Sequence, residues 1–148
     1  MAGKRELAEQ VWEALFGFVM HTRPQRDQIL ARLGLTPTEA KALYSLNGVE
    51  GRTMTELAAA WLCDPSTATW TVDRLERLAL AQRRPHPTDR RVRLVFLTEK
   101  GDSVRADLVN DMYQAPPELL QLTVDQLRSL RDLLEKLPAG LDEFPVPT

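Results

Sequence analysis

Three arginines and one aspartate crowd a short stretch of the chain. The sequence HPTDRRVRLVFLT, residues 86–98, places Arg90, Arg91 and Arg93 directly after Asp89. The stretch begins as a proline-rich turn and continues as an alternating apolar strand, so the cations should stand at the tip of a hairpin. Guanidinium groups bind carboxylates and phosphates through charge and paired hydrogen bonds. The arginines at the tip therefore indicate that this part of the protein binds an anion. The alternative interpretation is a charged surface that contacts only solvent.

The charge of the whole chain supports the first interpretation. The formal net charge is -2, yet residues 64–93 hold seven arginines against four acids, so this segment is +3 and the remainder is -5. An acidic body with one basic segment is typical of a protein that meets a local anion, such as a phosphate backbone.

Residues that could perform other chemistry are sparse. Cys63 is the single cysteine, which excludes an intramolecular disulfide and a cysteine-based zinc site, and we expect a buried structural thiol. His21 should lie at the surface or the core edge and His86 in the turn, and neither has a cysteine or carboxylate at ligand spacing. There is no phosphate-binding glycine loop and no nucleophile motif. We expect no enzyme, no metal and no cofactor.

The length and hydropathy of the chain predict one cytoplasmic domain. With 148 residues, the chain should form a single domain, 1–148, that buries a core without disulfides. No apolar run follows the N-terminus, and no stretch approaches the ~18 apolar residues that a membrane-spanning helix needs. We therefore expect neither a signal peptide nor a membrane partner.

The elements that position the basic hairpin can be read from periodicity and capping signals. Residues 5–33 predict one long helix with two neighbouring apolar stripes, with Pro24 as a kink or break and Gly34 as its stop. Three further helices should begin at the capping boxes TPTE (36–39) and TMTE (53–56) and at the Asp–Pro pair 64–65. They should run, in that order, to about Asn47, Leu62 and Leu78.

A change of period then predicts the hairpin and a helical C-terminal part. Strand, turn and strand should cover AQRRPHPTDRRVRLVFLT, with Val92, Leu94 and Phe96 on one face and Arg91, Arg93, Val95 and Leu97 on the other. A helix should follow from Thr98 to about Ala115. After two prolines, a capping box at Thr123 opens a last helix whose apolar stripe reaches Leu137, and the tail after it should be loosely ordered.

This order predicts a mainly α fold with a small β-hairpin wing. Two helices joined by the turn LCDPS and followed at once by a basic hairpin form a winged helix-turn-helix. The second helix can enter the major groove of DNA, and the hairpin tip can reach the adjacent minor groove, where the negative potential favours arginine. The winged lobe should cover about 35–98, and the helical segments 5–33 and 99–137 should form a dimerisation region.

The sequence resembles the MarR (multiple antibiotic resistance regulator) family of bacterial transcription factors. The wing DRRVRLVFLTEKG, residues 89–101, matches the family's Asp-x-Arg followed by five residues and Leu-Thr, and DPSTATWTVDRLERLAL resembles its recognition helix. The resemblance implies a homodimer built by the first and last helices of both chains. It also implies a small aromatic or lipophilic effector bound between the winged lobe and those helices, for which Trp12, Phe16 and Tyr44 are candidates; the alternative is that they are plain core.

The resemblance implies a set of DNA-binding residues. Arg90 and Arg91 would approach the minor groove, and Asp89 would brace the tip by pairing with an arginine, unless Asp89 and Arg91 only stabilise the hairpin. Thr36, Thr38 and Thr53 could touch phosphates through helix N-termini. The other candidates on the recognition helix and the wing are Ser66, Thr67, Thr69, Trp70, Arg74 and Arg93.

Two positions depart from the family's pattern. Family members often carry arginine where this chain has Trp70, and tryptophan cannot make a bidentate contact to guanine. Trp70 either faces the groove or points into the core. Ala79 stands where the family usually has glycine after the recognition helix, and a left-handed alanine there would cost roughly 1 kcal/mol.

The function predicted from these residues is sequence-specific DNA binding by a dimeric transcriptional regulator, most simply a ligand-responsive repressor with an inverted-repeat operator. One alternative is a winged helix that binds proteins without sequence-specific DNA binding, which Trp70 and the acidic body favour and the wing arginines oppose. Another is a helical dimer that binds or converts a small molecule. Titration of random duplex DNA at two salt concentrations separates the first alternative from DNA binding.

Overall fold

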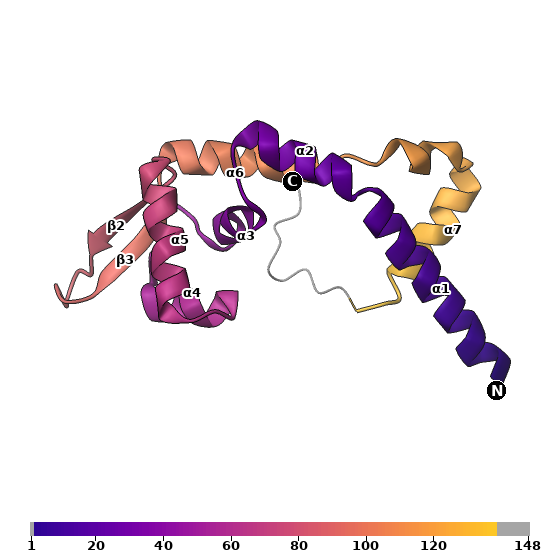
Figure 1. The fold of residues 1–148 in the computed structure, drawn as a ribbon, viewed down its shortest axis with the longest axis horizontal. Coiled ribbons are helices and arrows are strands. Elements are labelled where there is room, and N and C mark those ends of the chain that lie inside the picture. Colours follow the sequence, from indigo (N-terminus) through magenta and orange to yellow (C-terminus); the bar gives the residue numbers. More distant parts are fainter. Residues whose placement is uncertain (1, 139–148) are drawn as a thin grey trace.

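The computed structural model describes residues 2–138 and shows a winged lobe connected to two helical arms (Figure 1). The elements are α1 (Ala2–His21), α2 (Arg23–Leu33), α3 (Pro37–Ser45), β1 (Arg52–Thr53), α4 (Met54–Trp61), α5 (Pro65–Arg77), β2 (Ala81–Pro85), β3 (Arg93–Leu97), α6 (Glu99–Met112), the 3-10 helix η1 (Pro117–Gln121) and α7 (Val124–Leu134). The mainly α class with a β-hairpin wing is thereby confirmed.

The expected long first helix is broken into α1 and α2. The break lies at Thr22, whose hydroxyl donates to the carbonyl oxygens of Phe18 and Val19 at the end of α1. Arg26 donates to the Thr22 hydroxyl and to the Val19 carbonyl, each at 2.7 Å. Pro24 has no backbone N–H with which to continue the helical pattern, and these side-chain hydrogen bonds close the end of α1 just before it. At its other end α2 stops as predicted, with Gly34 in the left-handed region at φ 69°.

The capping signals predicted the other helix starts correctly. Thr36, Thr53 and Thr123 each form a complete capping box with the Glu or Gln three residues later, and Asp64 and Thr98 cap α5 and α6. The ends of the helices were less accurate: α3, α5 and α6 each stop one to three residues before the predicted position. Ends lack a comparable side-chain signal except where glycine supplies a left-handed residue.

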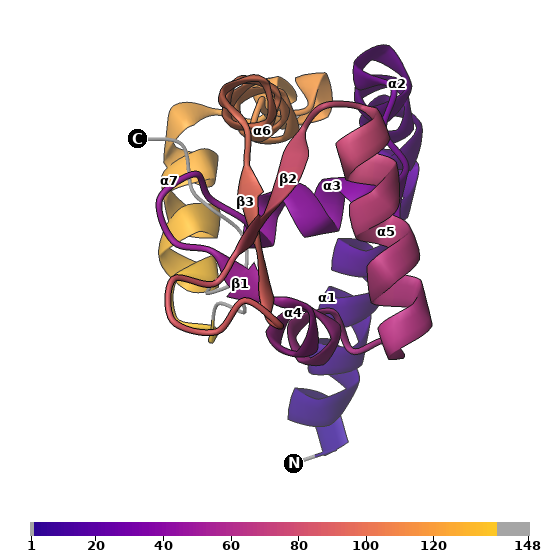
Figure 2. The same cartoon turned by 90° about the vertical axis from the view of Figure 1, so that its left-hand side faces the viewer.

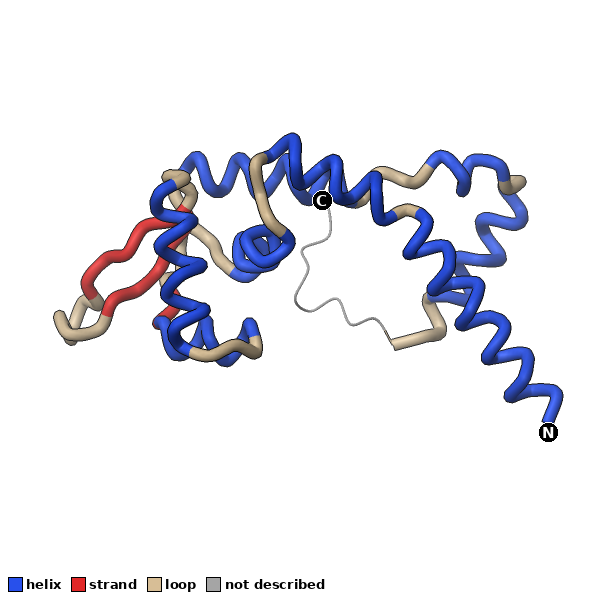
Figure 3. Tube along the Cα trace, viewed as in Figure 1, coloured by secondary structure: helices blue, strands red, loops and turns tan. Residues whose placement is uncertain are grey.

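The sheet has one strand more than the sequence predicted. The strand order is β1-β3-β2, all antiparallel, and β1 pairs Arg52 with Val95 and Thr53 with Leu94. A two-residue strand leaves no alternation to detect, so it could not be predicted from periodicity. β2 and β3 form the expected hairpin, with Pro85 opposite Arg93, and the turn between them projects from the lobe (Figure 3).

The core of the winged lobe lies between its helices and the inner face of the hairpin. Val95 and Leu97, which share one face of β3 as the alternation predicted, are buried together with Leu43, Leu57 and Leu75 from α3, α4 and α5. Leu108 of α6 joins the same cluster, and α6 also packs along α2. The recognition helix α5 and the wing therefore share one hydrophobic core, and Figure 2 shows them side by side.

A tight junction joins the end of α5 to the start of α6. Ala79 is in the left-handed region at φ 60°. This conformation was expected because the family that the sequence resembles usually has glycine at this position. The Thr98 hydroxyl donates to the Ala79 carbonyl at 2.6 Å, and Lys100 donates to the Leu78 carbonyl. Gly101 is required here, because a Cβ atom would lie 1.9 Å from the carbonyl oxygen of Leu80. The end of the recognition helix is thus held by the residues that follow the wing.

The two helical arms, α1 on one side and η1 with α7 on the other, expose much of their apolar surface. The exposed large side chains lie mainly on α1 and around η1 and α7: Leu7, Val11, Trp12, Phe16, Val19, Met20, Leu120, Leu122, Val124, Leu133, Leu134 and Leu137. The two arms lie near each other, away from the winged lobe (Figure 1). The predicted loose tail falls mostly on residues 139–148, which lie outside the described part of the chain.

The left-handed Ala79 gives a stability prediction. Ala79→Gly should raise the free energy of unfolding by roughly 1 kcal/mol, because glycine adopts this conformation without a steric cost. Equilibrium unfolding in urea measures the change. Ala106→Gly, at an exposed position inside α6, is the matched control and should lower stability by about as much. A destabilised Ala79→Gly protein would show that this turn is not strained.

Candidate nucleic-acid interface

The recognition helix α5 has a buried side and a polar side. Asp64 caps its first turn, accepting hydrogen bonds from the Thr67 amide at 2.9 Å and the Thr67 hydroxyl at 2.8 Å. Ala68, Thr71, Val72 and Leu75 are buried on the inner side. Ser66, Thr69, Trp70, Asp73 and Arg77 are exposed on the outer side. The structure thus resolves the open question about Trp70: its side chain points away from the core.

Arg83 of the wing holds the acidic residues of the recognition helix. Its guanidinium group contacts Glu76 and lies 2.8 Å from the Asp73 carboxylate. The Arg83 side chain is 22% exposed, so the ion pairs are only partly screened by water. Arg84, its neighbour, stacks on the Phe96 ring at 4.7 Å. Two of the arginines in the basic segment therefore serve the internal structure of the lobe.

Arg74 was predicted to contact DNA, and in the structure it has an internal partner. Its Nε atom donates to Glu39 at 3.0 Å, and the Glu39 side chain is fully buried. The second carboxylate oxygen of Glu39 accepts the Thr36 amide at 2.9 Å. Sequence spacing could not reveal this pair, because Glu39 and Arg74 are 35 residues apart in the chain and lie on different helices. Arg74 thus links α5 to the start of α3.

The tip of the wing exposes its cations. Arg90, Arg91 and Arg93 are exposed, and within residues 2–138 none of them forms an ion pair. Asp89 braces the tip, but not through the expected arginine side chain: its carboxylate accepts the backbone amide of Arg91 at 3.0 Å. An aspartate commonly closes a turn in this way, two residues before the amide it binds. The arginine side chains are therefore left available to an external anion.

The three threonines predicted to contact phosphates, Thr36, Thr38 and Thr53, differ in whether a helix cap already occupies their hydroxyl group. The hydroxyls of Thr36 and Thr53 accept amides of their own capping boxes, and their own amides are bound by Glu39 and Glu56. Thr38, in the first turn of α3, is exposed. The Thr67 hydroxyl is likewise engaged, with Asp64.

A pocket of about 430 Å³ lies where the helical region meets the winged lobe. Tyr44 lines it, as predicted, and burial raises the pKa of its phenol above the ordinary value, with the Tyr113 phenol adding to the effect. Its other lining residues, which the sequence reading did not single out, are Met20, Arg23, Arg26, Asp27, Leu30, Pro37, Ala40, Lys41 and Met112. The pocket combines apolar side chains with three cations and one carboxylate, Asp27, which lies 3.6 Å from Arg23.

Trp12 and Phe16, the other two candidates for the ligand site, do not line this pocket. They contact each other on α1, with ring centroids 6.1 Å apart, and both are exposed in the chain described here. They belong neither to the pocket nor to the core. The reason is the break at Thr22, which turns α1 away from the winged lobe, so that only Met20 at its end reaches the pocket (Figure 1).

The cysteine and the histidines have ordinary structural surroundings. Cys63 is half-buried against the core, less deeply than expected, and lines a small hollow with Trp61 and Thr67. His21 is exposed and pairs with Glu118 at 3.0 Å, and the Nδ1 atom of His86 accepts the Thr88 amide in the wing turn. Between residues 2 and 138, no three His, Cys, Asp or Glu side chains are grouped as metal ligands.

No helix of the described residues is both long and apolar enough to cross a membrane.

Comparison with known proteins points to one family. Residues 33–92 match the model of the MarR family. The HTH-type transcriptional regulator MhqR of Bacillus subtilis (strain 168) is 28% identical over 112 residues, which are 75% of this chain and 77% of MhqR. The crystal structure of YusO from Bacillus subtilis has a TM-score of 0.75 at 24% identity, covering 88% of this chain and 94% of YusO. A MepR–DNA complex from S. aureus has a TM-score of 0.63 at 22% identity, covering 84% of this chain and 99% of MepR.

The cap of the recognition helix gives a pH-dependent prediction. The hydrogen bonds from Thr67 lower the pKa of Asp64 in the folded protein. Its contribution to stability is therefore complete above the unfolded-state pKa and is lost as the pH falls through the lower, folded-state value. Asp64→Asn keeps a cap that does not titrate, so its free energy of unfolding should fall less than that of wild type between about pH 7 and about pH 3.

Urea unfolding at a series of pH values measures this difference. Glu50→Gln, which removes a carboxylate from an exposed loop, controls for the change in net charge and should retain the wild-type loss. An equal loss in Asp64→Asn and wild type would contradict the role of Asp64 as a charged cap.

Proposed function

We propose that the chain is a transcriptional repressor of the MarR family, which binds an inverted-repeat operator as a homodimer and responds to a small ligand. The observation that carries the DNA-binding part is the wing: Arg90, Arg91 and Arg93 are exposed beside the outer face of α5 and have no internal ion pair among the described residues. Exposed arginines at a hairpin tip suit the narrow minor groove next to the helix.

We assign the contacts to DNA in three groups. Ser66, Thr69 and Trp70 face the major groove from the first turns of α5, the part of a recognition helix that meets base edges. Arg90, Arg91 and Arg93 supply the wing contacts, while Asp89 shapes the turn and Arg74 acts by fixing α5. Thr38 contacts a phosphate, with Thr36, Thr53 and Thr67 as weaker candidates because their hydroxyls already serve helix caps.

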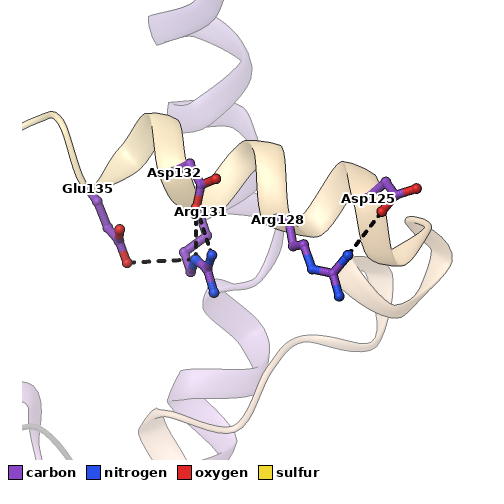
Figure 4. A network of polar contacts seen from close by, with 5 residues as sticks. All are labelled: Asp125, Arg128, Arg131, Asp132 and Glu135. Atoms are coloured by element: carbon purple, nitrogen blue, oxygen red, sulfur yellow. Dashed lines mark hydrogen bonds and ion pairs between the residues drawn. The ribbon is translucent and has the colours of Figure 1, made fainter.

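The proposed dimer uses the helical segments 5–33 and 99–137. On α7, Leu127, Leu130 and Leu134 line an apolar groove of about 540 Å³. Arg131 and Glu135 also line this groove. The charged residues of the helix form ion pairs, Asp125 with Arg128, and Arg131 with Asp132 and Glu135 (Figure 4). Since α1 also exposes Val11, Trp12 and Phe16, a second copy would remove both apolar faces from water.

The proposed ligand site is the pocket lined by Tyr44. Arg23, Arg26 and Lys41 surround apolar walls from Met20, Leu30 and Met112, which suits a small aromatic or lipophilic molecule with an acidic group. The pocket contacts α1, α2, α3 and α6, and α3 is tied to α5 through Glu39 and Arg74. A ligand that shifts α3 would therefore change the position of the recognition helix.

Selection of bound duplexes from a random pool tests the DNA-binding proposal. A two-fold dimer with one recognition helix in each subunit should select an inverted repeat, with half-site centres about 10 base pairs apart. The same protein should sediment as a dimer at micromolar concentration. A single asymmetric site, or a folded monomer, would contradict the dimeric mode. Failure to bind any duplex at low salt would favour the protein-interaction alternative.

The exposed wing gives a prediction for DNA binding. Arg90→Ala should leave thermal stability nearly unchanged, since an exposed charge contributes only ~0–1 kcal/mol. It should weaken DNA binding and reduce the slope of log K against log salt concentration by about one unit for each lost phosphate contact. Lys4→Ala, at an exposed position near the start of α1 and outside the proposed interfaces, is the control and should bind DNA like wild type. Equal affinity of Arg90→Ala and wild type would exclude Arg90 from the interface.

The change in DNA affinity when Asp89 is removed distinguishes two roles for this residue, as a simple negative charge or as a brace of the wing tip. Removing a negative charge should tighten DNA binding if only net charge matters. Because Asp89 holds the Arg91 amide and thereby shapes the tip, we expect Asp89→Ala to weaken binding instead. Asp89→Asn keeps an acceptor for the amide and should bind at least as tightly as wild type. Tighter binding by Asp89→Ala, measured by titration at fixed salt, would reject the bracing role.

A further inference from the structure

The recognition helix presents one large apolar side chain to the outside. Trp70 is 54% exposed, and it lies on the side of α5 opposite Ala68, Val72 and Leu75. Ser66, one turn earlier, and Asp73 and Arg77, one and two turns later, share this side because residues three and four apart on a helix are neighbours. The indole is therefore at the centre of the surface that the proposed function assigns to the major groove.

The surroundings of Trp70 make this surface less charged than its sequence suggests. Asp73 and Glu76 line a shallow hollow beside the indole together with Arg77. Both carboxylates are held by Arg83 from the wing, whose single positive charge offsets half of theirs, and Arg77 balances the remainder. The surface around the indole therefore has no net positive charge, so the natural partner of the apolar ring is a base edge.

The bases differ in what they offer to an indole. Thymine carries the apolar C5-methyl group in the major groove, and it places the acceptor O4 beside that methyl. The indole has an apolar face and a single donor, Nε1–H, so it can cover the methyl but cannot form the paired hydrogen bonds that arginine makes with guanine.

We propose that Trp70 reads the methyl group of a thymine in each half-site of the operator. The proposal rests on the proposed function, because it assigns a base to the helix already placed in the major groove. It makes Trp70 a specificity-determining residue, and the half-site should contain a thymine opposite it.

Uracil scanning of the selected operator tests the methyl contact directly. Each thymine of the half-site is replaced in turn by deoxyuridine, which keeps the hydrogen-bonding groups and lacks only the methyl. Wild-type protein should bind about fourfold more weakly at one position in each half-site, the factor that corresponds to ~0.8 kcal/mol for one buried methyl. Trp70→Ala should bind the thymine and uracil duplexes equally, whereas Glu50→Gln, in an exposed loop outside the proposed interface, should retain the fourfold difference. Trp70→Phe keeps an apolar ring and should retain part of it.

Several outcomes would overturn the proposal. A wild-type protein that is indifferent to every deoxyuridine, or a selected half-site without thymine, would do so without any variant. A Trp70→Ala protein that keeps the full uracil difference would assign the methyl contact to another residue. Uniform weakening of Trp70→Ala on all duplexes, with no uracil effect in wild type, would indicate packing against a sugar. Absence of binding to any DNA would instead overturn the proposed function, and this proposal with it.

Discussion

The ion pairs of Arg83 unite the wing and the recognition helix. Arg83 stands on β2 and holds Asp73 and Glu76 of α5, so a displacement of either element breaks two contacts. The same contacts offset the two acids nearest the proposed major-groove surface. The Arg83 guanidinium group therefore has two effects. It holds the hairpin against α5, and it reduces the negative charge on the side of α5 that would face DNA.

The basic segment divides into arginines with internal and external roles. Arg74, Arg83 and Arg84 are bound to Glu39, to the acids of α5 and to the Phe96 ring. Arg90, Arg91 and Arg93 project from a turn that Asp89 shapes through the backbone. Behind them, Thr98 and Gly101 close the junction around the strained Ala79. Some arginines of the lobe thus stabilise its internal structure, whereas the arginines at the wing tip remain exposed to solvent.

Local signals in the sequence predicted most of the fold, and the errors have physical causes. Capping boxes, the left-handed Gly34 and the alternation of β3 each depend on a few neighbouring residues, so the element order could be read directly. The pairing of Glu39 with Arg74 and of Arg83 with Asp73 joins distant segments and left no local pattern. Periodicity identified the apolar stripe of Trp12 and Phe16 but not what covers it, so it could not predict that both lie outside the pocket. Trp70 was undecided for the same reason.

The claim that wing and helix bind DNA as one unit is tested most directly by charge removal at Arg83. The affinity of Arg83→Gln for the selected operator should fall well below that of Arg90→Ala, because the variant both loosens the wing and exposes two uncompensated acids. Adding Asp73→Asn and Glu76→Gln to Arg83→Gln should recover much of the affinity, since the repulsion is then removed. An Arg83→Gln protein that folds and binds its operator like wild type would contradict the account.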